Sequence, residues 1–305
     1  MILNYSANKS SPRILLLGCN GQVGWELQRA LAPLGELIAL DRSRCDLLNF
    51  DSLRSIVIEA APQVIVNAAA YTAVDKAEQD IFTAEKINAE AVALLAEVSE
   101  QRGALFVHYS TDYVFDGEKI TPYVETDTTS PLSVYGASKR RGEEAVMASG
   151  CDFLMFRTSW VFAARGANFA KTILRLAQER ETLHIVADQW GAPTSAELIA
   201  DVTAHTLRDA LAKRAQGGLF HVAAAGETNW HGYANYVIEQ ATLFGAQFKA
   251  TSIEPIPASN YPLPARRPTN SRLDTTKLQN TFNLTLPDWR YHVRRMLMEL
   301  LGSNR

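Results

Sequence analysis

Short apolar runs that alternate with amphipathic stretches constrain the fold of this chain more than any other feature of its sequence. The first run, Arg13–Leu17, ends at a glycine, and helical spacing of apolar residues follows from Val23 to Leu34. Further runs of this kind occur at residues 36–41, 63–67, 104–108, 153–157 and 219–223. Strands that alternate with helices at this pitch predict an α/β fold built on a doubly wound parallel sheet.

A glycine-rich turn joins the first predicted strand to the first predicted helix. Gly18, Gly21 and Gly24 recur at every third position, so the backbone can turn tightly and approach a pyrophosphate at a helix N-terminus. The second predicted strand ends in Asp41, where an acid accepts hydrogen bonds from adenosine ribose hydroxyls in Rossmann-type folds. Two arginines follow that acid and suit a 2′-phosphate, so we expect both NADH and NADPH to bind. The glycine spacing alone is equally typical of an ordinary tight turn.

Composition excludes several classes of protein. The formal net charge of -3 gives no basic field for nucleic acid or an anionic membrane surface. No apolar run approaches the ~20 residues of a membrane helix, and residues 1–12 contain no signal-peptide pattern. We expect these twelve residues to be a disordered extension. Cys19, Cys45 and Cys151 are widely spaced and odd in number, which favours a reducing cytoplasm over a disulfide framework.

A tyrosine and a lysine four residues apart, Tyr135 and Lys139, lie in a stretch with helical character. This spacing places phenol and ammonium on one helix face, where the positive charge is expected to lower the tyrosine pKa. The same pattern is common on amphipathic surface helices. Thr111, however, follows the fourth predicted strand, and ligands in such sheets bind outside the carboxyl ends of the strands. We therefore expect its hydroxyl and the Tyr135 phenol to face one ligand.

Seven segments together resemble a known family over most of the chain. They read GCNGQVG at 18–24, VNAAAYT at 66–72, STDYVF at 110–115, YGASK at 135–139, RTSWVF at 157–162, DQWGAPT at 188–194 and RPTNSRLD at 267–274. On these segments the chain resembles the extended short-chain dehydrogenase/reductase superfamily and, within it, the dTDP-4-dehydrorhamnose reductase family.

The resemblance implies reduction of dTDP-4-dehydro-L-rhamnose to dTDP-L-rhamnose with NADPH or NADH, in the synthesis of cell-surface polysaccharide such as O-antigen. It implies that Tyr135 gives a proton to the carbonyl oxygen, that Lys139 holds the nicotinamide ribose, and that Thr111 hydrogen-bonds the reacting oxygen. Asp112 and Trp160 are expected to contact the sugar nucleotide. Besides Tyr135 and Lys139, the residues expected to line the cofactor are Gly18, Gly21, Gln22, Val23, Gly24, Asp41, Asp46, Leu47, Ala70, Tyr71 and Thr72.

A metal site and a homodimer are further implications of the resemblance. Some members bind Mg²⁺ through acids at a dimer interface, and the matching positions are Glu26, Glu197 and Glu299. Carboxylates suit this ion, although isolated acids on helices are usually only solvated.

The second half of the chain is expected to bind the sugar nucleotide. We predict a dinucleotide-binding domain at residues 13–160 with about 195–226, and a smaller, mixed domain at about 161–194 with 227–305. Five prolines between Pro255 and Pro268 predict a loop without regular structure. Its arginines, Arg266 and Arg267, together with Arg272, suit a diphosphate, although a solvated surface loop has the same composition. The six histidines are expected to be structural.

Other activities of the superfamily stay open at this point. Dehydratases carry Thr-Asp-Glu after the fourth strand, whereas this chain has Thr111, Asp112 and Tyr113, so water elimination is disfavoured. A different 4-keto sugar-nucleotide reductase, an epimerase that retains NAD, and a non-catalytic regulatory subunit with the same fold are the alternatives. The presence of Thr111, Tyr135 and Lys139 together argues against the last of these.

Overall fold

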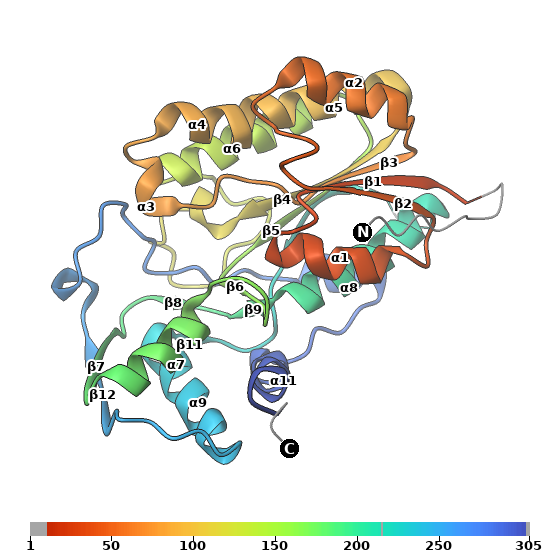
Figure 1. Cartoon of the computed structure of the whole chain (residues 1–305). Coiled ribbons are helices and arrows are strands. Elements are labelled where there is room, and N and C mark those ends of the chain that lie inside the picture. The colour runs from red at the N-terminus through yellow and green to blue at the C-terminus, as the bar shows by residue number, and fades with distance from the viewer. Residues whose placement is uncertain (1–10, 215, 303–305) are drawn as a thin grey trace.

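A central sheet of six parallel strands organises the protein (Figure 1). The computed structural model describes residues 11–214 and 216–302. Within these residues the strand order is β10-β5-β4-β3-β1-β2. The strands are β1 (Arg13–Leu17), β2 (Glu36–Leu40), β3 (Val64–Asn67), β4 (Leu105–Thr111), β5 (Phe153–Thr158) and β10 (Gly218–Val222). The strand order reverses between β1 and β3, which is the place where such sheets bind ligands.

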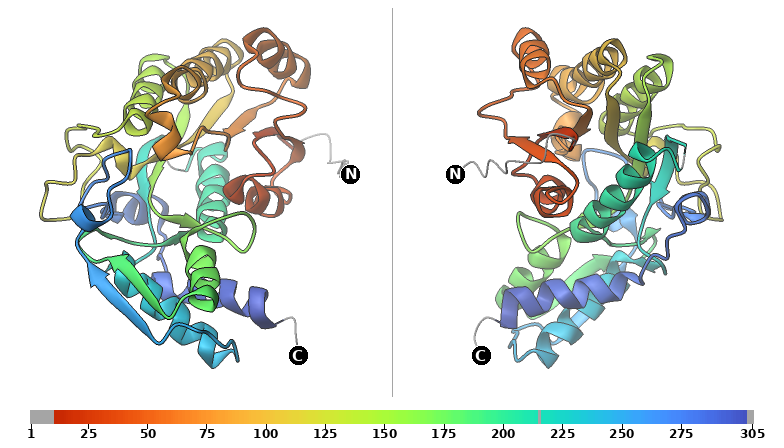
Figure 2. Two further views of the ribbon diagram at one scale, coloured as in Figure 1. Left: turned by 60° about the vertical axis from the view of Figure 1, so that its left-hand side comes forward. Right: turned by 90° about the vertical axis from the view of Figure 1, so that its right-hand side faces the viewer.

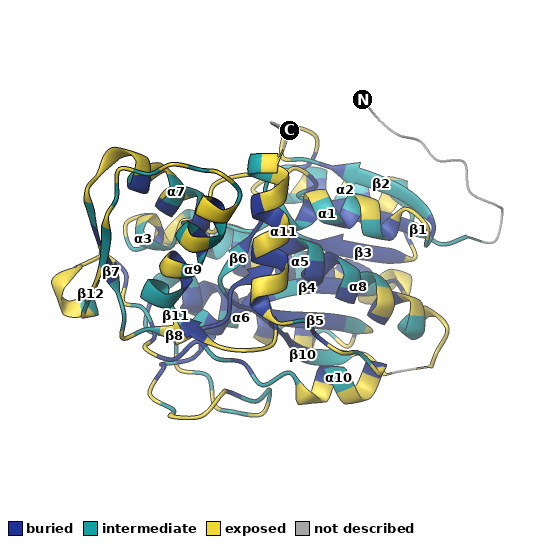
Figure 3. Cartoon of the chain, turned by 90° about the horizontal axis from the view of Figure 1, so that it is seen from below, coloured by how far each residue is buried: buried dark blue, intermediate teal, exposed yellow. Residues whose placement is uncertain are grey.

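Helices cover both faces of this sheet. Helices α2, α5 and α6 lie on one face, whereas α1 and α8 pack together on the other (Figure 1). Their bounds are α1 (Gln22–Leu31), α2 (Phe50–Ala60), α5 (Ala91–Arg102), α6 (Val134–Ala148) and α8 (Ala196–Leu211). Because both faces are covered, the strands are almost continuous apolar runs, and all four residues of β3 are buried (Figure 3). The predicted α/β fold with a Rossmann-type doubly wound sheet is confirmed.

A second group of elements lies beyond the carboxyl ends of the sheet strands (Figure 1). Its largest sheet is a parallel pair, β7 (Thr182–Val186) and β12 (Ser252–Ile256), against which α9 (Trp230–Leu243) packs. Helix α9 also contacts α7 (Phe169–Glu179) and α11 (Trp289–Leu301), and Figure 2 shows α9 and α11 side by side. Two further strand pairs are shorter: β6 (Val161–Phe162) with β9 (Thr194–Ser195), and β8 (Trp190–Gly191) with β11 (Thr228–Asn229). The predicted division into two domains stays a prediction.

Strand β12 corrects the prediction that the segment from Pro255 to Pro268 lacks regular structure. Pro255 lies inside this strand and is paired with Ile185. Within the described residues β12 pairs with β7 alone, and an edge strand tolerates the missing N–H donor of a proline. The rest of the segment follows the prediction more closely, with a single turn of 3-10 helix at Ala258–Asn260.

The helical segment that leads from β3 to β4 is interrupted in the structure. It consists of α4 (Ile81–Glu85), a π-helical turn (Lys86–Glu90) and then α5. Such π-helical turns often lie at functional sites. The remaining helices are α3 (Val74–Ala77), a 3-10 turn at Asp112–Val114, and α10 (Thr276–Phe282).

The first residues described already belong to the fold. The carbonyl oxygen of Pro12 accepts a hydrogen bond from the backbone N–H of Glu36, at 2.9 Å. The rest of the predicted extension, residues 1–10, lies outside the described residues. In the part of the chain that the structure describes, the helices are too short or too polar to cross a membrane.

Candidate active site

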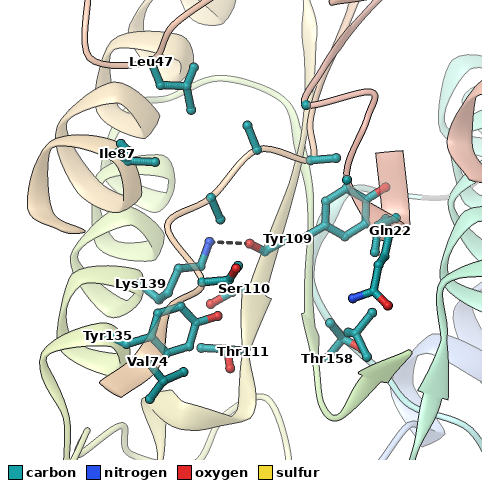
Figure 4. Close-up of a pocket in the computed structure, with 18 of the residues that line it drawn as sticks. Gln22, Leu47, Val74, Ile87, Tyr109, Ser110, Thr111, Tyr135, Lys139 and Thr158 are labelled. Carbon is teal, nitrogen blue, oxygen red and sulfur yellow. Dashed lines mark hydrogen bonds between the residues drawn. The ribbon is translucent and has the colours of Figure 1, made fainter. Parts of the chain in front are cut away.

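The carboxyl ends of the sheet strands open onto a cavity of about 630 Å³ (Figure 4). Its walls come from the ends of β4 and β5, from the loops that follow β1, β2 and β3, and from the first turns of α1 and α6. Most of the residues predicted to bind a cofactor or a sugar nucleotide line this one cavity: Gly18, Gly21, Gln22, Val23, Asp41, Asp46, Leu47, Ala70, Thr72, Thr111, Asp112, Tyr135, Lys139 and Trp160. Gly24 and Tyr71 are predicted to bind the cofactor but do not line the cavity. The structure therefore brings together motifs that are far apart in the sequence.

The glycine-rich turn lets the backbone approach a ligand at the start of α1. Gly18 has φ +78°, and a Cβ there would lie 2.7 Å from the backbone nitrogen of Ala69. A Cβ on Gly24 would lie 2.1 Å from the carbonyl oxygen of Gly18, so Gly24 shapes the turn. The first turn of α1 contains no acidic residue and its N-cap, Gly21, makes no side-chain cap. This helix N-terminus therefore presents free N–H groups to an anion.

The Asp41 carboxylate at the end of β2 is ionised and held in place. It accepts hydrogen bonds from the Ser43 hydroxyl at 2.6 Å and backbone N–H at 3.0 Å, and from the Asn20 amide at 2.7 Å. These hydrogen bonds lower the pKa of Asp41, and the bond from the Ser43 hydroxyl contributes most. Arg42 also lines the cavity and lies 3.6 Å from the Asp46 carboxylate. The negatively charged Asp41 and the positively charged Arg42 are thus neighbours where the adenosine ribose is predicted to bind.

Asn88 fixes the loop that follows β3. Its side chain accepts from the backbone N–H of Tyr71 at 2.9 Å and donates to the Tyr71 carbonyl at 3.0 Å. The same amide also donates to the Ser138 hydroxyl on α6 at 3.1 Å. Asn88 is buried in the π-helical turn, which brings its side chain to this junction. Tyr71 therefore supports the cavity wall, while its neighbours Ala70 and Thr72 form the wall itself.

Tyr135 lies at the start of α6, where Ser133 caps the helix by accepting from the Gly136 N–H at 3.2 Å. Burial raises the pKa of Tyr135 to about 12, and hydrogen bonding by Thr111 opposes this shift only in part. The prediction that Lys139 lowers this pKa is therefore wrong for the protein's own groups. The four-residue spacing gives a shared helix face, but it does not show how deeply the phenol is buried.

Lys139 is directed at the backbone of β4 instead of at the phenol. Its ammonium donates to the Tyr109 carbonyl at 2.6 Å and lies 3.2 Å from Nε2 of His108 (Figure 4 shows the first contact). The side chain is buried, and burial lowers the pKa of Lys139 to about 8, while the charge of Glu143 opposes that shift.

Three buried side-chain oxygens lie in the cavity wall at the ends of β4 and β5. Among the described residues, Ser110 Oγ, Thr158 Oγ1 and Asp112 Oδ2 make no hydrogen bond. Buried polar groups are nearly always paired, so these oxygens are suited to a polar ligand. Burial also raises the pKa of Asp112 to about 6. Ser110 and Thr158 were missed as site residues, although both lie within the STDYVF and RTSWVF segments.

Trp160 forms an aromatic wall beside these oxygens. Its φ of +48° is uncommon for a residue with a side chain, and such strain often occurs at functional sites. The indole stacks on Trp230 with 3.6 Å between ring centroids and 13° between planes. Trp160 lines the cavity, and its contact with the sugar nucleotide stays a prediction.

The three glutamates predicted to bind Mg²⁺ come together around a separate small pocket. Glu26, Glu197 and Glu299 line it with His292. Burial and the charge of Glu197 raise the pKa of Glu26, but Glu197 is already paired with Arg295 at 3.2 Å. In the described part of the chain, no three His, Cys, Asp or Glu side chains are arranged to hold a metal ion. A Mg²⁺ site at a dimer interface therefore stays a prediction.

The arginines predicted to bind a diphosphate differ in their surroundings. Arg267 donates to both carboxylate oxygens of Asp75, at 3.0 and 2.7 Å, and Arg272 pairs with Glu227 at 2.9 Å. Arg266 is exposed. None of the three lines the cavity, so a diphosphate role for them stays a prediction.

Comparison with known proteins agrees with this geometry. A model of the family described as RmlD substrate binding domain matches residues 12–301, which is most of the chain. The chain belongs to this family. A dTDP-4-dehydrorhamnose reductase from Burkholderia thailandensis is 54% identical over 297 residues, covering 95% of this chain and 100% of that protein. The corresponding reductase from Shigella flexneri is 53% identical over 294 residues, covering 95% and 98%.

A solved structure shows the same fold at lower identity. The dTDP-4-dehydrorhamnose reductase from Bacillus anthracis, crystallised in complex with NADP, aligns with a TM-score of 0.86 and 33% identity. The alignment covers 95% of this chain and 99% of that one. The resemblance that the seven sequence segments indicate is confirmed.

Proposed function

We propose that this chain reduces dTDP-4-dehydro-L-rhamnose to dTDP-L-rhamnose with NADPH or NADH, a step in dTDP-rhamnose biosynthesis. The observation that carries the proposal is that Thr111, Tyr135 and Lys139 line the same cavity as the glycine-rich turn. The relatives that bear this activity in their names match the chain over nearly its whole length.

The cavity fits a nicotinamide dinucleotide. The free N–H groups at the start of α1 suit the pyrophosphate, and the ionised Asp41 suits the hydroxyls of the adenosine ribose. Arg42 beside it suits a 2′-phosphate, which is why we propose that both cofactors bind. When bound, the reduced nicotinamide supplies the hydride that adds to the carbonyl carbon of the sugar.

Tyr135 is the proton donor in this proposal. With a pKa of about 12 the phenol stays protonated throughout the neutral range, which is the form that an acid catalyst needs. Thr111 hydrogen-bonds the same phenol and so stands where the carbonyl oxygen of the substrate would accept from both groups. Lys139, with a pKa of about 8, is mostly charged at pH 7 and holds the ribose next to the nicotinamide.

The sugar nucleotide meets Asp112, Ser110, Thr158 and Trp160. The unpaired oxygens of the first three suit sugar hydroxyls, and the indole suits an apolar face of the ring. Position 113 is Tyr113, whose pKa is raised by burial, so no acid follows Asp112 to eliminate water. The site is therefore built for reduction rather than dehydration.

A turnover assay tests the proposal directly. Purified protein is mixed with dTDP-4-dehydro-L-rhamnose and either NADPH or NADH, and loss of absorbance at the nicotinamide band is followed. Tyr135→Phe is expected to lower kcat by about 10²–10⁴-fold with little change in cofactor affinity, because only the proton donor is removed. Tyr236→Phe, on α9 and outside the cavity, is the matched control and is expected to keep full activity.

Two outcomes would contradict the proposal. The first is no turnover with either cofactor, and the second is a Tyr135→Phe variant as active as the parent. Parallel assays with UDP- and GDP-linked 4-keto sugars separate the dTDP-sugar reductase from its neighbours. A homodimer and a cytoplasmic location also stay predictions, of which sedimentation velocity measures the first.

A further inference from the structure

His108 is buried directly behind Lys139. It lies on β4, is 1% exposed, and its ring stacks on Phe106 with 5.8 Å between centroids and 14° between planes. Its Nε2 is 3.2 Å from the Lys139 ammonium, which also donates to the carbonyl of the next residue, Tyr109. His108 and Tyr109, adjacent residues of β4, therefore both contact the Lys139 ammonium group.

The chemistry of the pair fixes the state of the imidazole. An ammonium group has donors only, so Nε2 of His108 must be the acceptor and the ring proton must sit on Nδ1. There the Nδ1–H donates to the backbone of Asn67 on β3. The side-chain nitrogen of Asn67 lies 3.4 Å from Nδ1, but it is also a donor and so makes no hydrogen bond with the protonated Nδ1. Burial and the Lys139 charge both hold the pKa of His108 well below its usual range. The ring is therefore neutral and has a single orientation.

The number of N–H donors on the Lys139 ammonium indicates the role of its contact with His108. A lysine ammonium has three N–H groups, and His108 and Tyr109 engage two of them. Since the two acceptors lie on the strand side, the third N–H is left for the cavity that Lys139 lines. We propose that His108 is a positioning residue that aims the third N–H of Lys139 at the nicotinamide ribose. This inference rests on the proposed function only in requiring a nicotinamide cofactor.

The other groups that face Lys139 do not replace this contact. Glu143, one turn further along α6, acts on the lysine through its charge but is bound to Arg157 of β5 at 2.9 and 2.6 Å. Tyr135 on the same helix is protonated, and Asn67 on β3 carries no charge. If His108 only filled the core, its ring nitrogens would not stabilise the protein, because burial of an imidazole costs more free energy than burial of a phenyl ring.

Two polar substitutions of different length separate positioning from core filling. In His108→Gln the amide oxygen is three bonds from Cβ, as Nε2 is, and so can still accept from Lys139. In His108→Asn the amide ends at the position of Nδ1 and cannot reach the ammonium. His221→Asn is the matched control, because His221 is equally buried on β10, donates from Nδ1 to the Tyr123 carbonyl at 3.0 Å, and does not line the cavity.

The readouts are the NADPH dissociation constant, measured by nicotinamide fluorescence between pH 6 and 9, and the melting temperature. We expect His108→Asn to weaken binding about tenfold or more, since hydrogen bonds to charged groups are worth about 1.5–3 kcal/mol. His108→Gln is expected to stay within about threefold of the parent, the residual change reflecting imperfect geometry. The pH above which binding weakens should also fall in the Asn variant, because the ammonium has lost an acceptor.

The inference is overturned if His108→Asn binds NADPH as the parent does, or if Gln is no better than Asn. It is also overturned if His221→Asn weakens binding equally, since general loosening would then explain the effect. Should the Asn variant not fold, His108→Met fills the space without a strong acceptor and replaces it. Cofactor binding needs no sugar, so a protein that binds NADPH in this pattern but turns over no dTDP sugar would refute the proposed function alone.

Discussion

The buried ion pair between Glu143 and Arg157 joins α6, the helix that carries Tyr135 and Lys139, to the sheet, and its removal should change both stability and pH dependence. The side chains are 1% and 3% exposed and make two hydrogen bonds, at 2.9 and 2.6 Å. In Glu143→Gln the shape is kept and the charge is lost. Apart from the glutamine oxygen, Arg157 then keeps the Glu125 carbonyl at 3.4 Å and the face of Phe115, with 5.0 Å from Cζ to the ring centroid.

The expected loss of stability follows from these contacts. Removing one partner of a buried pair typically costs about 3–5 kcal/mol, because the other charge is left uncompensated. The glutamine oxygen can still accept one bond, so we expect about 3 kcal/mol, a large share of the 5–15 kcal/mol typical of a folded protein. When Glu143→Met and Arg157→Met are combined, no charge is left buried. This double variant should therefore be more stable than Glu143→Met alone or Arg157→Met alone.

Urea unfolding followed by circular dichroism measures the free energy of unfolding for the parent, both single variants and the double variant. A loss below about 1 kcal/mol in Glu143→Gln, or a double variant no better than the singles, would refute the assignment of a buried, unscreened pair. Activity gives a second readout. Because the charge of Glu143 raises the pKa of Lys139, its removal should move the alkaline fall of kcat/KM to a lower pH. An unmoved alkaline limb would contradict that coupling.

Three further predictions concern the cavity and its rim. Gly24→Ala places a Cβ 2.1 Å from the Gly18 carbonyl oxygen, so NADPH affinity should fall at least tenfold in a fluorescence titration, and unchanged affinity would contradict this geometry. Burial raises the pKa of Asp112 to about 6, so its carboxylate is lost as pH falls through that value. We therefore expect kcat/KM to decline below pH 6, and Asp112→Asn to abolish that limb of the profile. Asp75→Ala removes the partner of Arg267 and should raise the KM for the sugar nucleotide several-fold in steady-state assays while leaving NADPH affinity unchanged.

Much of the site could be predicted from the sequence because its parts lie at the ends of strands. A glycine follows β1, Asp41 follows β2 and Thr111 ends β4, and each is marked by local composition. A parallel sheet carries all of these carboxyl ends to one edge, so recognising the strands was enough to place the residues together. Tyr135 joined them because α6 begins soon after the same edge.

The contacts that complete the site depend on how deeply side chains are buried and on partners that are distant in sequence. The spacing of Tyr135 and Lys139 could not show that both would be buried, nor that Lys139 would turn toward a strand 30 positions earlier. The Asp75–Arg267 pair joins residues 192 positions apart, which no local pattern predicts. His108 looked structural because a lone histidine in an apolar strand usually is. Only the packing of α6 on β4 gives it a charged neighbour.

The opposite effects of burial on Tyr135 and Lys139 bear on the direction of catalysis. Burial raises the pKa of the phenol to about 12 and lowers that of the ammonium to about 8, yet both groups keep their protons at pH 7. The proposed reduction needs a proton donor, and a phenol of this pKa can serve as one without any activation by Lys139. Oxidation of the product would instead require the phenolate, which is scarce until the pH is far higher. The site's own groups therefore favour reduction near neutral pH. Oxidation of dTDP-L-rhamnose should be slow at pH 7 and should accelerate as pH rises toward 8, before Lys139 loses its charge.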